Sequence, residues 1–276
     1  MIKQFISKHS IISFLFITFA ISWSIAFYIL ASTTKAATEF PATMVIGGIA
    51  LGLVPSLTGI LLSKYLHTPL LYRLKLKSSK SFYFISLLFI PLTALLGACI
   101  TNLYITPWSF HFNIAPLIIG LIWPIFSSCG EELGWRGFLL PRLLKKYSPS
   151  TSSAIIGVIW GIWHIPMFWL TYRSLPNTGI VMTFLQAFNL CLLTYLMVAL
   201  QVLSKGNIKL AILFHYTITA MGILPQAYIS WSNSTEFTDL NSVVVLIVIR
   251  LIAILIFYSK YNKQINLDTN INSFSL

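Results

Sequence analysis

The sequence contains very little charge and few acidic side chains. Of its 276 residues 57% are hydrophobic and only 9% are charged, and Asp and Glu together number six. A soluble domain carries about a quarter charged residues, so this composition excludes a soluble globular protein. Apolar runs of about 20 residues favour membrane-spanning helices over the short alternating strands of a barrel. We therefore expect an all-α fold, a polytopic membrane protein.

Cysteine is also scarce, and no soluble domain, internal repeat or low-complexity tract separates the apolar runs. Cys99, Cys129 and Cys191 are odd in number and lie in apolar runs, which argues against a disulfide framework and predicts small core residues. The sequence thus predicts a single membrane domain over residues 1–276, with a polar C-terminal tail at 262–276.

The apolar runs predict about eight transmembrane helices. The first run is longer than the apolar part of a secretory signal and no convincing cleavage site follows it, so we expect it to be retained. The expected spans are about 11–32, 43–63, 81–103, 114–130, 151–171, 179–203, 208–230 and 240–259.

The 18 Lys and Arg residues are distributed unevenly between the loops, and cytoplasmic loops normally carry the excess. With the N-terminus inside, the cytoplasmic residues are Lys3, Lys8, Lys64, Arg73, Lys75, Lys77, Lys80, Arg136, Arg142, Lys145, Lys146, Lys205, Lys209, Lys260 and Lys263. Lys35 and Arg173 then lie outside, and Arg250 lies within the last span. Both termini are therefore expected to be cytoplasmic. The net charge of +12 is then a topology signal, aided by attraction to anionic lipids, and no nucleic-acid partner is expected.

Glu131 and Glu132 are the only acidic residues between positions 40 and 235. Ionisable side chains at membrane depth are costly, and each is a functional candidate. Neighbouring helical residues point about 100° apart, so the two carboxylates are expected to face different ways. Glu132 and Arg136 are four residues apart and can pair, which leaves Glu131 to face a cavity and accept a proton from water. The alternative is an interfacial salt bridge with a spare charge at the helix end.

Two of the five histidines lie deep within apolar runs. His164 in "WGIWHIP" and His215 in "LFHYTITA" belong to different spans, and Thr219 follows His215 by one helical turn. The alternative for such a histidine is a bond to a backbone carbonyl, such as the one that Pro166 frees in the span of His164. Together with Glu131, the two histidines are expected to converge on one water molecule or one metal ion.

Other polar and small residues within the spans have structural explanations. Gln186 and Asn189 are expected to link helices by hydrogen bonds, and Gly134 and Gly137 to allow close helix approach. Arg250 either extends to the cytoplasmic side or pairs with a carboxylate.

The three polar clusters resemble the motifs of the CPBP family, the CAAX proteases and bacteriocin-processing enzymes also called Abi. That family has EExxxR, an aromatic-xxx-His and His-xxx-Asn on separate transmembrane helices. Here the motifs read "EELGWR" at 131–136 with the continuation "GFLLPRL", then "WGIWH" and "HYTIT". Trp160 stands at the usual Phe position, and Thr219 stands where the family usually has Asn. The resemblance covers residues 115–222, which would form the protease core.

The resemblance implies a membrane-embedded endopeptidase. Glu131 with His164 would activate a water molecule for attack on the scissile carbonyl, and His215 with Thr219 would stabilise the oxyanion. Because a hydroxyl donates one hydrogen where an amide donates two, Thr219 predicts a weaker oxyanion contact. The residues that would support the site are Glu132, Arg136 and Trp160.

The cofactor is left open by the sequence. Glu131, His164 and His215 would form a His₂Glu set of the kind that holds catalytic zinc, although an HExxH motif is absent. Both a zinc-dependent and a metal-free, glutamate-based mechanism have been proposed for the family that the motifs resemble.

The leading hypothesis is an intramembrane endopeptidase that cleaves membrane-associated peptides or protein tails near the cytoplasmic face. The compact chain and the style of its first motif indicate a prokaryotic source, hence a multi-pass protein of a bacterial plasma membrane. This source favours peptide maturation or bacteriocin self-immunity over prenylated CAAX tails as the role. The alternative, motivated by Thr219, is a non-catalytic immunity or scaffold protein of the same fold. A proton-coupled transporter would be expected to show an inverted repeat, and none is visible in the sequence.

Overall fold

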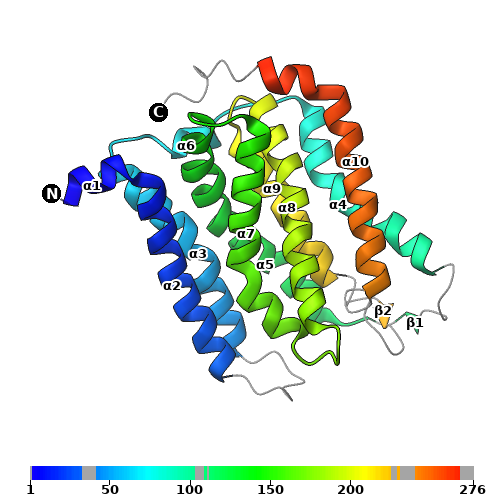
Figure 1. Ribbon diagram of the computed structural model, residues 1–276. Coiled ribbons are helices and arrows are strands. Elements are labelled where there is room, and N and C mark those ends of the chain that lie inside the picture. The colour runs from blue at the N-terminus through cyan, green and yellow to red at the C-terminus, as the bar shows by residue number, and fades with distance from the viewer. Residues whose placement is uncertain are drawn as a thin grey trace.

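The structure is a computed structural model that describes residues 2–32, 42–102, 109–110, 112–224, 229–230 and 240–267. Within these ranges the chain is almost entirely helical (Figure 1). The helices are α1 (Ile2–Lys8), α2 (Ser10–Ser32), α3 (Ala42–Tyr65), η1 (Leu71–Leu74), α4 (Lys80–Asn102), α5 (Ile114–Glu132), η2 (Leu133–Leu139), α6 (Leu140–Leu144), α7 (Pro149–Tyr172), α8 (Gly179–Leu203), α9 (Ile208–Ile223) and α10 (Leu240–Leu267). A two-residue strand β1 (Ser109–Phe110) pairs antiparallel with β2 (Ile229–Ser230).

The expected all-α, polytopic membrane fold is confirmed. Within the described ranges seven helical segments are long and apolar enough to cross a membrane, and α9 is an eighth, shorter apolar helix of 16 residues. At 1.5 Å per residue α9 is about 24 Å long. It ends at Ile223 and not at the predicted residue 230. Pro225 follows closely in the sequence, and a proline disfavours the helical conformation of the residue before it.

The helices form one bundle in which α7 and α8 lie side by side with α5 and α9 behind them (Figure 1). The α2–α3 pair covers one flank, and α4 with α10 covers the other. α5 packs against both α3 and α9, so its polar residues meet partners from separate parts of the chain. α1 and the end of α10 lie at the same end of the bundle (Figure 1), as expected for an even number of crossings. That this end is cytoplasmic stays a prediction.

The fourth span was predicted to end near residue 130, and this prediction is wrong. α5 continues directly into the π-helical segment η2 and then into α6, so that the span covers residues 114–144. Glu131 and Glu132 therefore lie within a continuous helical segment and not at its end. The helix continues because the bundle supplies partners for these carboxylates, as described below, and the chain does not have to turn toward water.

Small residues allow α3 to approach this region closely, as expected for Gly134. A Cβ atom on Gly130 would lie 2.6 Å from the carbonyl oxygen of Gly52, and one on Gly134 would overlap the carbonyl group of Pro55. Gly137 instead faces the side chains of Leu70 and Ile208. The close backbone contact with α3 is therefore made by Gly130 and Gly134, and not by Gly137.

Polar residues connect four helices on the other side of the bundle, as predicted for Gln186 and Asn189. Gln186 Nε2 donates to the hydroxyl of Tyr172 at 3.2 Å, and Asn189 Nδ2 donates to Gln186 Oε1 at 3.3 Å. Arg250 Nη1 donates to Asn189 Oδ1 at 2.9 Å, and its Nε lies 3.5 Å from Thr93 Oγ1. Arg250 is buried, so it does not extend to the surface, and no ion pair with a carboxylate is found for it in the described residues.

The predictions for the cysteines and for the C-terminal tail are only partly confirmed. All three cysteines are free thiols, as expected, but Cys99 and Cys129 are exposed and not in the core. Lipid is as apolar as a protein core, so a small apolar side chain is tolerated on this surface. Of the predicted polar tail, residues 262–267 continue α10, and residues 268–276 lie outside the described ranges, as do Lys35 and His111.

Candidate functional site

Glu131 and Glu132 end α5 immediately before the π-helical segment η2. Such segments widen the helical turn and are frequent at functional sites. The N–H of Leu140 bonds to the carbonyl of Trp135, five residues earlier, and Gln201 of α8 donates to the carbonyl of Arg136 at 2.9 Å. Both carboxylates are buried, so their charges must be met inside the protein.

The predicted pairing of Glu132 with Arg136 is confirmed. Arg136 Nη1 lies 3.0 Å from Glu132 Oε1, and neither side chain is accessible to solvent. Arg136 Nη2 also donates to Thr194 Oγ1 of α8 at 3.2 Å. The guanidinium carbon lies 4.4 Å from the ring centroid of Trp160, within the range of a cation–π contact.

Glu132 also contacts His215, which the sequence did not predict. His215 Nδ1 lies 2.8 Å from Glu132 Oε1, and since an ionised carboxylate only accepts, Nδ1 is the donor. His215 Nε2 then lies 4.0 Å from Glu131 Oε1. The two acids do point in different directions, but one imidazole ring reaches both, with one nitrogen toward each carboxylate.

Trp160 and His164 approach Glu131 from α7. Trp160 Nε1 donates to Glu131 Oε2 at 2.7 Å. His164 Nδ1 lies 2.9 Å from the carbonyl oxygen of Trp160, and a carbonyl only accepts, so Nδ1 carries the hydrogen. His164 Nε2, which lies 3.9 Å from Glu131 Oε2, is then the unprotonated nitrogen of the neutral ring. A bond from His164 to a backbone carbonyl was the alternative expected from the sequence, and such a bond is present. Its acceptor is the carbonyl of Trp160 and not that of Ile162, the carbonyl freed by Pro166.

The cluster therefore directs two imidazole Nε2 atoms at one buried carboxylate. Separations of 3.9 and 4.0 Å are too long for direct hydrogen bonds and are typical of groups that a water molecule bridges. The side chain of His164 is 17% exposed whereas that of Glu131 is 5% exposed, so the cluster opens on the side of His164. A carboxylate and an unprotonated imidazole nitrogen facing one space can remove a proton from water.

Part of the chain is similar to known proteins. Residues 113–221 match the family described as type II CAAX prenyl endopeptidase Rce1-like. The chain is 24% identical over 150 residues to CAAX prenyl protease 2 of Methanococcus maripaludis, an alignment that covers 48% of this chain and 47% of the relative. Residues 113–221 are therefore similar to CAAX-type proteases. The chain spans about half the length of the curated relative that it matches.

One predicted site residue, Thr219, lies at the edge of the cluster. Thr219 Oγ1 has its described contact with Ser127 Oγ, at 3.3 Å. Ser127 precedes Glu131 by four residues on α5, and Thr219 follows His215 by four residues on α9, so this contact forms the next layer of the same helix pair. The sequence interpretation overlooked Ser127, although its spacing from Glu131 places it on the same helix face.

The same distances bear on the predicted zinc ligands. Within the described residues no group of three or more His, Cys, Asp and Glu side chains has the spacing of a metal site. Ligands about 2.0–2.1 Å from a tetrahedral zinc lie about 3.3 Å from one another. The separations of Glu131 from His164 and His215, 3.9 and 4.0 Å, are wider. The mechanism proposed below therefore uses no metal, and zinc at these residues stays a prediction.

Replacing Arg136 with methionine is expected to destabilise the protein by about 3–5 kcal/mol, because a buried carboxylate then loses its cation. The double variant Glu132→Gln/Arg136→Met removes both charges and should recover part of this loss. The measurement is the free energy of unfolding in mixed micelles, titrated with a denaturing detergent. A double variant no more stable than Arg136→Met alone would show that the ion pair is not what stabilises this part of the bundle.

Proposed function

We propose that this protein is an intramembrane endopeptidase of the CAAX type, which hydrolyses membrane-associated peptides or protein tails with a water molecule activated by Glu131 and His164. The observation that supports the proposal most is that two histidines approach the same carboxylate, Glu131. His164 and His215 come from different helices, each is fixed through Nδ1, and each presents Nε2 to Glu131 at 3.9 or 4.0 Å.

In this mechanism a water molecule lies between Glu131 Oε2 and His164 Nε2. As its oxygen forms a bond to the scissile carbonyl carbon, its proton passes to one of these two groups. The bond of Trp160 Nε1 to Glu131 Oε2 holds the carboxylate in position during the attack. The peptide C–N bond then breaks, and the proton is delivered to the leaving nitrogen.

The developing oxyanion requires hydrogen-bond donors on the opposite side of the carbonyl. His215 can donate from Nε2 when both ring nitrogens are protonated, while its Nδ1–H stays on Glu132. Thr219 and Ser127 lie one helical turn away and share a 3.3 Å contact. We assign their hydroxyls to the second, weaker part of the oxyanion site.

The buried position of the cluster among spanning helices suits a substrate that is itself held at the membrane. In a bacterial plasma membrane the role would be peptide maturation or bacteriocin self-immunity. The Methanococcus maripaludis relative is called a CAAX prenyl protease, so prenylated tail peptides should be tested as substrates alongside unmodified peptides. The edge position of Thr219 favours the second candidate, a non-catalytic immunity or scaffold protein with this fold.

Glu131→Gln and His164→Asn are each expected to lower kcat by about 10²–10⁴, because each removes an acid–base group. The assay uses purified protein in liposomes with a library of fluorogenic peptides and a prenylated tail peptide. His67→Asn is the matched control, since His67 has a positive φ of 53°, which Asn tolerates, and should keep full activity. Equal cleavage by wild type and Glu131→Gln would reject Glu131 as the base. If no peptide is cleaved while immunity or secretion is retained in cells by Glu131→Gln, the non-catalytic function is correct.

Thr219→Asn is expected to raise kcat by about tenfold or more with little change in KM, because an amide supplies a second donor to the transition state. Thr219→Val keeps the shape but removes the hydroxyl and should fall below wild type. Single-turnover rates in liposomes measure both effects. A Thr219→Asn variant no faster than wild type would contradict the assignment of position 219 to the oxyanion side.

A further inference from the structure

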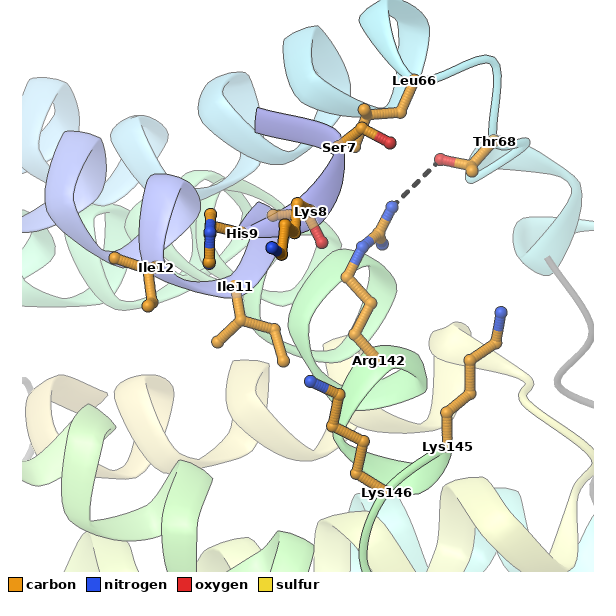
Figure 2. A pocket seen from close by; sticks show the side chains of 11 residues that line it. Ser7, Lys8, His9, Ile11, Ile12, Leu66, Thr68, Arg142, Lys145 and Lys146 are labelled. Carbon is orange, nitrogen blue, oxygen red and sulfur yellow. Dashed lines mark hydrogen bonds between the residues drawn. The ribbon is translucent and has the colours of Figure 1, made fainter. Parts of the chain in front are cut away.

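A separate cavity of about 370 Å³ lies at the end of the bundle that holds the N-terminal helix. Figure 2 shows side chains from the α1–α2 junction, the segment after α3 and the end of α6 converging on it. Its cations are Lys8, Arg142, Lys145 and Lys146. None of the proposed catalytic residues lines it, and Arg142 follows Glu131 by eleven residues, about 16 Å along the helix.

The positive charge of this cavity has no acidic counterpart in the described structure. Its lining contains no carboxylate. Glu131 and Glu132 are the acidic residues within the described ranges, and their ion pairs are with Arg136, His164 and His215. Four cations around one cavity repel one another, so an anion is the ligand that this arrangement favours.

Arg142 is fixed in position at the side of the cavity. It is 7% exposed, its Nη1 donates to the carbonyl of Phe138 at 2.8 Å, and its Nη2 donates to Thr68 Oγ1 at 3.1 Å. Its guanidinium carbon lies 3.5 Å from the ring centroid of Phe138. A guanidinium has five N–H donors in a planar fork that suits phosphate oxygens, so a preorganised phosphate contact is available here.

The cavity lies at the level where membrane-spanning segments end. The first span starts at Ser10, the second ends at Tyr65 and the fourth ends at Leu144, and the cavity is lined by residues from all three ends. Ile12 lines it as well. Ile12 and Phe16 are 61% and 73% exposed and lie on the same face of α2. An apolar surface therefore leads from the cavity along the spanning part of α2.

We propose that this cavity binds the phosphate group of an anionic phospholipid, whose acyl chains lie along Ile12 and Phe16. Arg142 contacts the phosphate, and Lys8, Lys145 and Lys146 supply the surrounding positive charge. A soluble phosphate ester has the same charge but no acyl chains for the apolar surface of α2. The proposal does not depend on peptide hydrolysis, since the catalytic cluster and this cavity share no residue.

The test is lipid binding by the purified full-length chain in a neutral detergent, measured by thermal unfolding and by mass spectrometry of the intact complex. Phosphatidylglycerol should raise Tm and remain bound, whereas phosphatidylcholine with the same acyl chains and glycerol 3-phosphate should do neither. Arg142→Gln/Lys146→Gln should weaken phosphatidylglycerol binding by about tenfold or more, as expected for the loss of two cations near a lipid phosphate. Lys205→Gln/Lys260→Gln removes the same charge outside the cavity and should bind as wild type does.

Arg142 is buried, so its replacement can also disturb the fold. The variant Lys145→Gln/Lys146→Gln leaves the contacts of Arg142 intact and should also weaken phosphatidylglycerol binding. Unchanged phosphatidylglycerol binding by this variant, or equal losses in the cavity and control variants, would overturn the proposal. Stabilisation by glycerol 3-phosphate equal to that by phosphatidylglycerol would also overturn it, in favour of a site for soluble phosphate compounds.

Discussion

The ion pair between Glu132 and Arg136 is the interaction on which the centre of the bundle depends. Neither side chain reaches solvent, and an unpaired charge at this depth costs several kcal/mol. The same pair positions the groups around Glu131. Arg136 stacks on Trp160, whose Nε1 bonds to Glu131, and Glu132 holds His215 through Nδ1. The Glu132–Arg136 pair therefore neutralises buried charge within the membrane and also positions the side chains around Glu131.

The two adjacent carboxylates, Glu131 and Glu132, have different surroundings and different roles. Glu132 Oε1 bonds to a guanidinium and an imidazole, and Glu132 Oε2 has no hydrogen-bond partner in the described structure. Glu131 accepts a bond from an indole at Oε2 and faces two ring nitrogens at about 4 Å. The first carboxylate is thus held by Arg136 and His215, and the second faces the two imidazoles across a distance that a water molecule can bridge. Trp160 makes this division sharper, since the Phe that is usual at this position has no N–H to offer Glu131.

The sequence predicted what depends on local spacing and membrane chemistry. The pairing of Glu132 with Arg136 follows from their separation of four residues, and most span boundaries follow from apolar length. The π-helical segment was not predictable, because its Arg136 carbonyl is satisfied by Gln201, which is 65 residues later in the chain. The bond between Glu132 and His215 depends in the same way on how α5 packs against α9. Local spacing placed Thr219 with His215 on one face, but it could not show that Thr219 would meet Ser127.

In the proposed mechanism Glu131 and His164 act as one unit on a single water molecule. A kinetic cycle in liposomes tests this by comparing the double variant Glu131→Gln/His164→Asn with each single variant. Groups that act as a unit are strongly non-additive, so the double variant should be about as slow as the slower single variant. Losses that multiply, so that the double variant is slower by the product of the two single effects, would contradict the claim and show that the two residues act independently.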